Sequence, residues 1–135
     1  MRAGRARRLA APLGAAALVA VATLALAVRD PHRPGSWGWC PTQVLTHLDC
    51  PACGSLRAVH DLTQLDLAAA ASSNLLLVVA LPVVLALWLR QVAVAWRGGE
   101  AIRPLTVPPA VWVVGLGMAA AFTVARNLPG SWLAA

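Results

Sequence analysis

Three apolar runs, each about long enough to cross a bilayer, constrain the fold of this chain more than any other feature. They cover residues 9–28, 67–89 and 105–125. Because the hydrocarbon core of a bilayer is about 30 Å thick, roughly twenty apolar residues span it as a helix. A helix also supplies hydrogen-bond partners for all of its own backbone groups, which the bilayer cannot provide. We therefore predict an all-α integral membrane protein with three transmembrane helices.

The composition supports a membrane protein and argues against nucleic-acid binding. Of the 135 residues, 59% are hydrophobic, which leaves too few polar side chains to cover a soluble domain of this size. The net charge is +6, carried by eleven arginines. These arginines flank the apolar runs and form neither a basic stripe nor a platform interleaved with aromatic residues. We expect the lipid bilayer, and not nucleic acid, to be the main partner.

The placement of arginines predicts the orientation in the membrane. Four arginines lie in the basic segment 1–8, and the connection 90–104 contains three more. The connection 29–66 has three arginines but four aspartates, and the tail 126–135 has one arginine. Because arginine-rich segments stay on the cytoplasmic side, we predict a multi-pass protein of the cell membrane with segments 1–8 and 90–104 in the cytoplasm. The connection 29–66 and the tail 126–135 would then be extracytoplasmic.

The first apolar run has a second interpretation. Its basic start and the small residues ALA at positions 25–27 are also typical of a cleaved signal peptide. The central apolar region of such a peptide is usually about 7–15 residues long, and the run here is longer. We therefore favour a retained helix, with the cleaved peptide as the alternative.

The second run carries polar residues near its start and a proline in its middle. We expect Asn74 to face protein and not lipid, because an amide in hydrocarbon needs hydrogen-bond partners. Pro82 removes one backbone donor, so we expect it to kink the helix.

All three cysteines lie in one stretch of the first connection, CPTQVLTHLDCPACGSLRA, residues 40–58. The residues that follow predict a short amphipathic helix, with Ser55 as its N-cap and its end merging into the second run. Within it, Arg57 and Asp61 are four residues apart and are placed to pair. The predicted fold thus has an extracytoplasmic cysteine loop and a short amphipathic helix between the first two spans.

Three chemistries compete for Cys40, Cys50 and Cys53, and the sequence leaves them open. A structural disulfide is ordinary in an oxidising compartment, and Cys40 bonded to one of the other two would close the larger loop. The Cys-x-x-Cys spacing also suits thiol–disulfide exchange, although no βαβ pattern surrounds it. The turn CPACG is typical of half a zinc knuckle, with Cys40 as a third ligand and His47, His60 or Asp49 as a candidate fourth. We expect no cofactor, with zinc as the alternative.

The order Cys-Pro, Leu-Thr, Cys-Pro-x-Cys-Gly-Ser-x-Arg-Ala and a spaced series of Leu, Asp, Ala and Asn resembles a bacterial membrane family. It is the family catalogued as domain of unknown function 2752. The matching residues are Cys40, Pro41, Leu45, Thr46, Cys50, Pro51, Cys53, Gly54, Ser55, Arg57, Ala58, Leu62, Asp66, Ala70 and Asn74. The sequence RNLP at positions 126–129 resembles the C-terminal signature of the family. The resemblance implies a small multi-span protein of the bacterial inner membrane, and its polar motif residues are Arg57, Asp66, Asn74 and Arg126.

The chain departs from the family at three positions. The family usually has glycine where this chain has His47 and Leu65, and it usually has proline where this chain has Leu75. A glycine at the first of these positions argues against His47 as a metal ligand common to the family.

These patterns favour a structural or interaction role over an enzymatic one. We predict that the cysteine loop forms a folded cap over the outer helix ends, where Arg57 and Arg126 meet Asp61, Asp66 or Asn74. The alternative is a thiol–disulfide or metal-handling membrane protein that uses the cysteines. A membrane-protein partner or a homo-oligomer is compatible with both interpretations.

Overall fold

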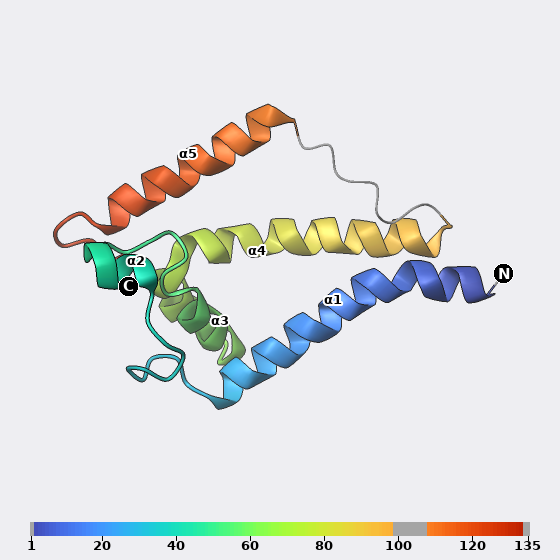
Figure 1. Cartoon of the computed structure of the whole chain (residues 1–135), viewed down its shortest axis with the longest axis horizontal. Helices are drawn as coiled ribbons and strands as arrows, with labels where there is room; N and C mark the ends of the chain where they lie inside the picture. Colours follow the sequence, from blue (N-terminus) through green and yellow to red (C-terminus); the bar gives the residue numbers. More distant parts are fainter. Residues whose placement is uncertain (1, 99–107, 134–135) are drawn as a thin grey trace.

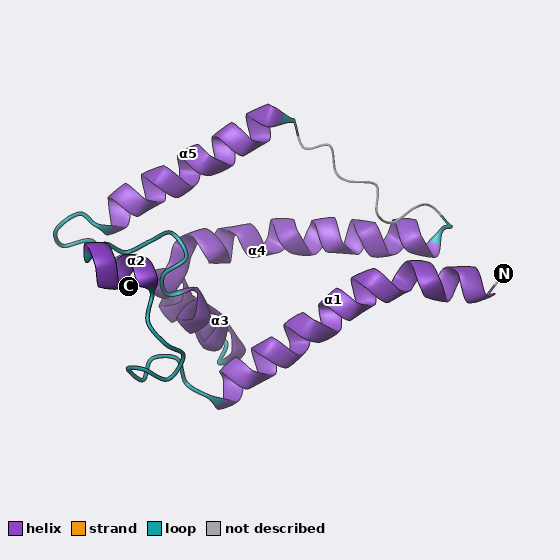
Figure 2. Cartoon of the chain, viewed as in Figure 1, coloured by secondary structure: helices purple, strands orange, loops and turns teal. Residues whose placement is uncertain are grey.

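The computed structural model describes residues 2–98 and 108–133, which form helices and no strand (Figure 2). The helices are α1 (Arg2–Val28), α2 (Pro41–Thr46), α3 (Ser55–Thr63), α4 (Leu67–Trp96) and α5 (Pro109–Arg126). Three of them, α1, α4 and α5, are long and apolar enough to cross a membrane. The predicted all-α fold with three candidate spanning helices is therefore confirmed. The predicted start of the third run, and Arg103 in the connection before it, lie outside the described residues.

The three long helices run in alternating directions (Figure 1). The start of α1 and the end of α4 lie at one end of the molecule, whereas α2, α3 and the end of α5 lie at the other. The segment 29–66, which contains every cysteine, is thus gathered at a single end of the long helices. We call this segment the cap.

Helices α1 and α4 are joined at the end opposite the cap. The Trp88 indole Nε1 donates a hydrogen bond to the carbonyl oxygen of Pro12 over 3.0 Å. The guanidinium carbon of Arg5 lies 4.8 Å from the centre of the Trp96 ring. A cation at the C-terminus of a helix interacts favourably with the helix dipole, and its position over an indole adds a cation–π attraction. Basic residues of α1 therefore hold the last turn of α4.

Helix α5 stands apart from α4 along most of its length (Figure 1). Its hydrogen bonds to the rest of the protein come from Arg126 and Asn127 at its C-terminal end, and they reach the cap. The cap is therefore the place where α5 is attached.

Helix α4 consists of two helical stretches separated at Asn74. The backbone of Asn74 is extended, with φ −160° and ψ 91°, and its Oδ1 accepts a hydrogen bond from the N–H of Leu77 over 2.9 Å. An extended residue whose side chain accepts from the N–H three residues later is an N-cap. Asp66 caps the first stretch in the same way, through the N–H of Ala69. The backbone break lies at Asn74 and not at Pro82, where we expected the kink.

Helix α3 differs from its prediction at both ends. Gly54, with φ 77°, takes the N-cap position, and Ser55 is the first helical residue and not the cap. The helix ends at Thr63, and a turn in which Leu65 has φ 62° separates it from α4. The amphipathic helix therefore packs beside the second span and does not merge into it. Its fully buried residue is Ala58.

His47 and Leu65 are the two non-glycine residues with positive φ in the described chain, at 56° and 62°. The left-handed region costs a residue with a side chain roughly 1–2 kcal/mol, and glycine adopts it without this cost. These are the two positions at which the resembled family usually has glycine. At both positions, this chain therefore has a side chain in a backbone conformation that favours glycine.

Replacing Leu65 with glycine is expected to raise the free energy of unfolding by up to about 1 kcal/mol. The side chain of Leu65 is 90% exposed, so little packing is lost. The matched control is Leu67→Gly, which removes another exposed leucine from a helical position and should be destabilising. Unfolding in mixed detergent micelles measures both variants, and a loss of stability in Leu65→Gly equal to that in Leu67→Gly would contradict the assigned strain.

Candidate thiol site in the cap

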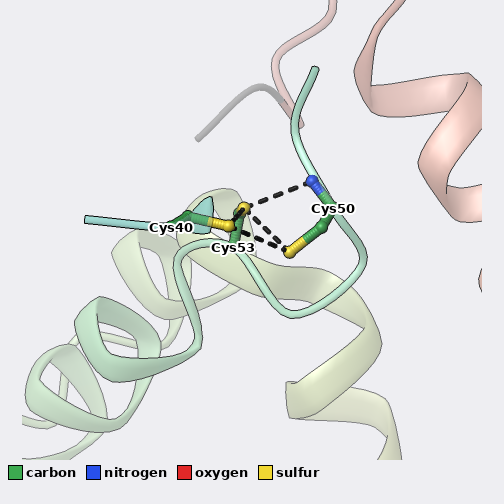
Figure 3. Close-up of side chains that lie close together, drawn as sticks. All are labelled: Cys40, Cys50 and Cys53. Carbon is green, nitrogen blue, oxygen red and sulfur yellow. Dashed lines mark hydrogen bonds between the residues drawn. The ribbon is translucent and has the colours of Figure 1, made fainter. Parts of the chain in front are cut away.

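The three cysteine sulfurs converge in the cap (Figure 3). The Sγ–Sγ distances are 2.9 Å for Cys50–Cys53, 3.1 Å for Cys40–Cys53 and 3.6 Å for Cys40–Cys50. All three residues are free thiols. The predicted disulfide from Cys40 to one of its neighbours stays a prediction. His47 is the C-cap residue of helix α2, and it is not part of the cysteine cluster.

Local backbone geometry places each sulfur. Cys40 is the N-cap residue of α2, and Pro41 occupies the first helical position, where a missing N–H costs nothing. Cys50 and Cys53 lie on opposite sides of a tight turn, in which the N–H of Cys53 donates to the carbonyl of Cys50 over 3.0 Å. The left-handed Gly54 then leads the chain into α3. We did not predict α2, although the Cys-Pro dipeptide is a signal for its start.

The local environment separates the acidities of two of these thiols. The backbone N–H of Gln43 is the largest of several hydrogen-bond contributions that lower the pKa of Cys40 to about 7. Burial, together with hydrogen bonds to the neighbouring sulfurs, raises the pKa of Cys53 to about 12. In the described structure, therefore, Cys40 ionises far more readily than Cys53. An ionised thiol is both the better nucleophile and the better metal ligand.

Asn74 of α4 forms hydrogen bonds to the cysteine turn. Its amide Nδ2 donates to the carbonyl oxygens of Pro51 and Cys53, each over 3.0 Å, and lies 3.1 Å from the hydroxyl of Ser55. The side chain is 1% exposed. Because its Oδ1 also caps the second stretch of α4, one side chain joins that helix to the turn.

Arg126 binds the same turn from α5. Its Nη1 donates to the carbonyl oxygens of Cys50 and Cys53, both over 2.9 Å. The Cys53 carbonyl therefore accepts hydrogen bonds from α4 and α5 at once. The resemblance to the family singled out Asn74 and Arg126, and the structure shows that they share one acceptor.

The guanidinium of Arg126 is buried, and no carboxylate of residues 2–98 or 108–133 forms an ion pair with it. The residue is 1% exposed, and its Nε and Nη2 have no hydrogen-bond partner. The Phe122 ring centre lies 5.1 Å from the guanidinium carbon, which supplies a cation–π contact but no negative charge. A buried charge without a compensating anion is costly, so this arginine marks a place where negative charge would be favourable.

Asn127 ties the chain just before the cysteine turn. Its Oδ1 accepts from the N–H of Asp49, and its Nδ2 donates to the carbonyl of Asp49, both over 2.9 Å. The Asn127 amide thus bonds to both the N–H and the carbonyl of Asp49, and these two hydrogen bonds fix the backbone at that residue. The sequence RNLP thus supplies two of the groups that hold the cap.

Asp61 has partners other than the predicted one. It is buried and accepts hydrogen bonds from Ser73, over 2.8 Å, and from His32, over 2.7 Å. These contacts join α3 to α4 and to the loop after α1. Arg57, the expected partner of Asp61, forms no ion pair with the described residues and lines a cavity beside the thiols. Asp66 is the exposed N-cap of α4 and meets neither arginine.

The cluster opens on a cavity of about 490 Å³. The three cysteines line one part of it. Polar and aromatic side chains line other parts, including His32, Arg33, Trp37, Trp39, Gln43 and Arg57. Cys40 and Cys50 are partly exposed at this cavity, whereas Cys53 is buried.

Comparison with known proteins identifies a matching family but indicates no activity. The profile of the family described as "Protein of unknown function (DUF2752)" matches residues 40–88, which confirms the resemblance drawn from the cysteine motif. The matched segment runs from the cysteine cluster through α3 and into α4, and it includes Asn74. No curated protein and no solved structure was found to match this chain significantly.

Proposed function

We propose that this chain is a structural membrane protein whose cap fixes the ends of three spanning helices. The observation that carries the proposal is the carbonyl oxygen of Cys53, which accepts hydrogen bonds from Asn74 of α4 and Arg126 of α5. A single backbone group thus connects two helices that otherwise lie apart. The cysteine turn acts as the central piece of this connection.

The distribution of polar residues supports a structural role over transport. The stretches 9–28, 67–89 and 109–125 contain no titratable residue. Ionisable groups inside a membrane usually mark the path of an ion or substrate, and these spans lack them. Asn74 lies at the cap end of α4 and uses its side chain for hydrogen bonds to the cap. The bilayer is the partner this arrangement requires, and a protein partner or homo-oligomer stays a prediction.

The proposed orientation has the cap outside the cytoplasm. The start of α1, whose sequence includes Arg5, Arg7 and Arg8, lies at the end of the molecule opposite the cap, and the positive-inside rule keeps such a basic group in the cytoplasm. The cap itself combines three arginines with four aspartates. This arrangement supports a cell-membrane location with an extracytoplasmic cap.

Chymotrypsin added to intact spheroplasts tests the cap and its orientation together. Trp39 is exposed before the cysteine cluster, and we expect cleavage after it in the unmodified protein. Asn127→Ala removes both bonds to Asp49, a loss of about 1–3 kcal/mol. Cleavage after Leu48, whose scissile bond leads to Asp49, should then become about tenfold faster. Val124→Ala, at an exposed position of the same helix, is the matched control.

Each site reports on a separate part of the proposal. Cleavage after Trp39 only in lysed cells would place the cap in the cytoplasm. Equal cleavage after Leu48 in the unmodified protein and in Asn127→Ala would show that the end of α5 does not hold the cap.

A further inference from the structure

We propose that the three cysteine sulfurs bind one zinc ion as thiolates, with Arg126 as the counter-charge and a water molecule as the fourth ligand. This inference rests on the proposed cap, because the ion would close the turn that Asn74 and Arg126 hold. It also differs from the sites suggested by the sequence, in which His47, His60 or Asp49 was the candidate fourth ligand.

The arrangement of the sulfurs is the first support. All three sulfur atoms lie within 4.8 Å of one another. A disulfide needs two sulfurs and leaves the third without a role, whereas a metal ion uses all three. Tetrahedral zinc with bonds of about 2.3 Å places its sulfurs about 3.8 Å apart. The observed separations of 2.9–3.6 Å require only a small outward shift.

The charge of Arg126 is the second and independent support. Three thiolates around a divalent zinc ion carry a net charge of −1, and the three thiol protons leave for solvent on binding. Arg126 carries +1, is buried, and donates to the carbonyls of Cys50 and Cys53, the two cysteines of the turn. Its remaining nitrogen atoms lack partners in the described structure. An anionic metal centre on this turn gives the buried guanidinium a negative charge that no carboxylate of the described residues supplies.

The open side of the cluster defines the fourth position. Within residues 2–98 and 108–133, no histidine, aspartate or glutamate places a ligand atom together with the three sulfurs. The sulfurs instead line the cavity of about 490 Å³, which has room for water or a small ligand. Zinc sites with three protein ligands characteristically keep such an open position. The site therefore binds an ion that can exchange a ligand with the exterior.

Cobalt(II) titration of the full chain, purified in detergent and reduced under anaerobic conditions, tests the site. We expect one equivalent of cobalt to give the charge-transfer and ligand-field bands of a tetrahedral thiolate centre, and zinc to abolish them. Cys40→Ser should lose the charge-transfer intensity of one sulfur and bind far more weakly. His47→Ala should bind as the unmodified protein does, because this side chain lies outside the cluster.

Arg126 variants separate the counter-charge from simple packing. Arg126→Gln removes the charge and should weaken metal binding about 10–100-fold, the usual effect of losing a group that supports the ligands. Arg126→Lys keeps the charge and should retain most of the affinity. Equal affinities for the glutamine variant and the unmodified protein would remove Arg126 from the site.

Two results would overturn the zinc site. One is three reduced thiols that bind no cobalt or zinc, and the other is a disulfide from Cys40 that forms in the presence of stoichiometric zinc. In either case the chymotrypsin assay still reports whether the cap is intact, so failure of the metal site is distinguishable from failure of the structural role. If Arg126→Gln does not fold, the comparison of Cys40→Ser with His47→Ala decides the proposal.

Discussion

Replacing Asn74 with alanine is expected to lower the free energy of unfolding by about 3–5 kcal/mol. The substitution removes the hydrogen bonds of the Asn74 amide to two carbonyl oxygens and one hydroxyl. It also removes the N-cap of the second stretch of α4. Removal of an N-cap costs about 1 kcal/mol, and each buried polar group left without a partner costs about 1–3 kcal/mol. Part of this cost is spared, because the Cys53 carbonyl keeps its bond to Arg126. Reversible unfolding in mixed detergent micelles measures the change.

Two further variants show which function of Asn74 matters. Asn74→Asp keeps an oxygen for the N–H of Leu77 but places a carboxylate against carbonyl oxygens, so we expect a loss at least as large as for alanine. Ser72→Ala is the control, because this exposed hydroxyl bonds only to the carbonyl of Ala69 in its own helix. Its effect should stay within about 0.5 kcal/mol. An alanine at position 74 that costs no more than one at position 72 would refute the role of Asn74 in the cap.

Proline should be tolerated at position 75 and should disrupt the protein at position 77. Leu75 is the first residue after Asn74, the N-cap residue of the second stretch of α4. At this position of a helix, the backbone N–H has no hydrogen-bond partner within the helix. Proline also disfavours the helical region for the residue before it, and Asn74 is already extended. Leu77 differs because its N–H donates to Asn74 Oδ1. Leu77→Pro removes this bond and should cost about 3 kcal/mol or more.

The proline pair is a sharp comparison because Leu75 and Leu77 are both partly buried. We expect Leu75→Pro to unfold within about 1 kcal/mol of the unmodified protein, since proline also reduces the freedom of the unfolded chain. Leu77→Pro should show lower stability and faster proteolysis. Equal damage at both positions would mean that the helix does not restart at Asn74.

Local sequence patterns predicted the long helices but not the break in α4 at Asn74. The apolar runs are long enough to cross a bilayer. A single segment can form all of its backbone hydrogen bonds there only as a helix. In the family, glycine is usual where His47 and Leu65 have positive φ, and proline is usual where Leu75 begins the second stretch of α4. No backbone conformation was predicted at these positions, and the structure alone shows the positive φ of His47 and Leu65 and the helix start after Asn74.

Contacts between distant segments could not be predicted in this way. Arg126 and Cys50 are 76 residues apart, and no periodic pattern connects them. Asp61 was expected to pair with Arg57 within its own helix, but the folded chain brings His32 and Ser73 to it. The short helix α2 was missed because six residues are too few to show periodicity. The family resemblance singled out Asn74 and Arg126, but only the structure shows their shared acceptor.

A double-mutant cycle between Asn74→Ala and Arg126→Gln asks whether one carbonyl group connects α4 and α5. Unfolding free energies of the four proteins are measured under the same metal conditions. Because either side chain alone keeps the Cys53 carbonyl hydrogen-bonded, removing the second one leaves this acceptor without either donor and should cost more than the same removal from the unmodified protein. We predict a coupling energy of at least about 1 kcal/mol. Costs that add to within about 0.5 kcal/mol would contradict a shared attachment point in the cap.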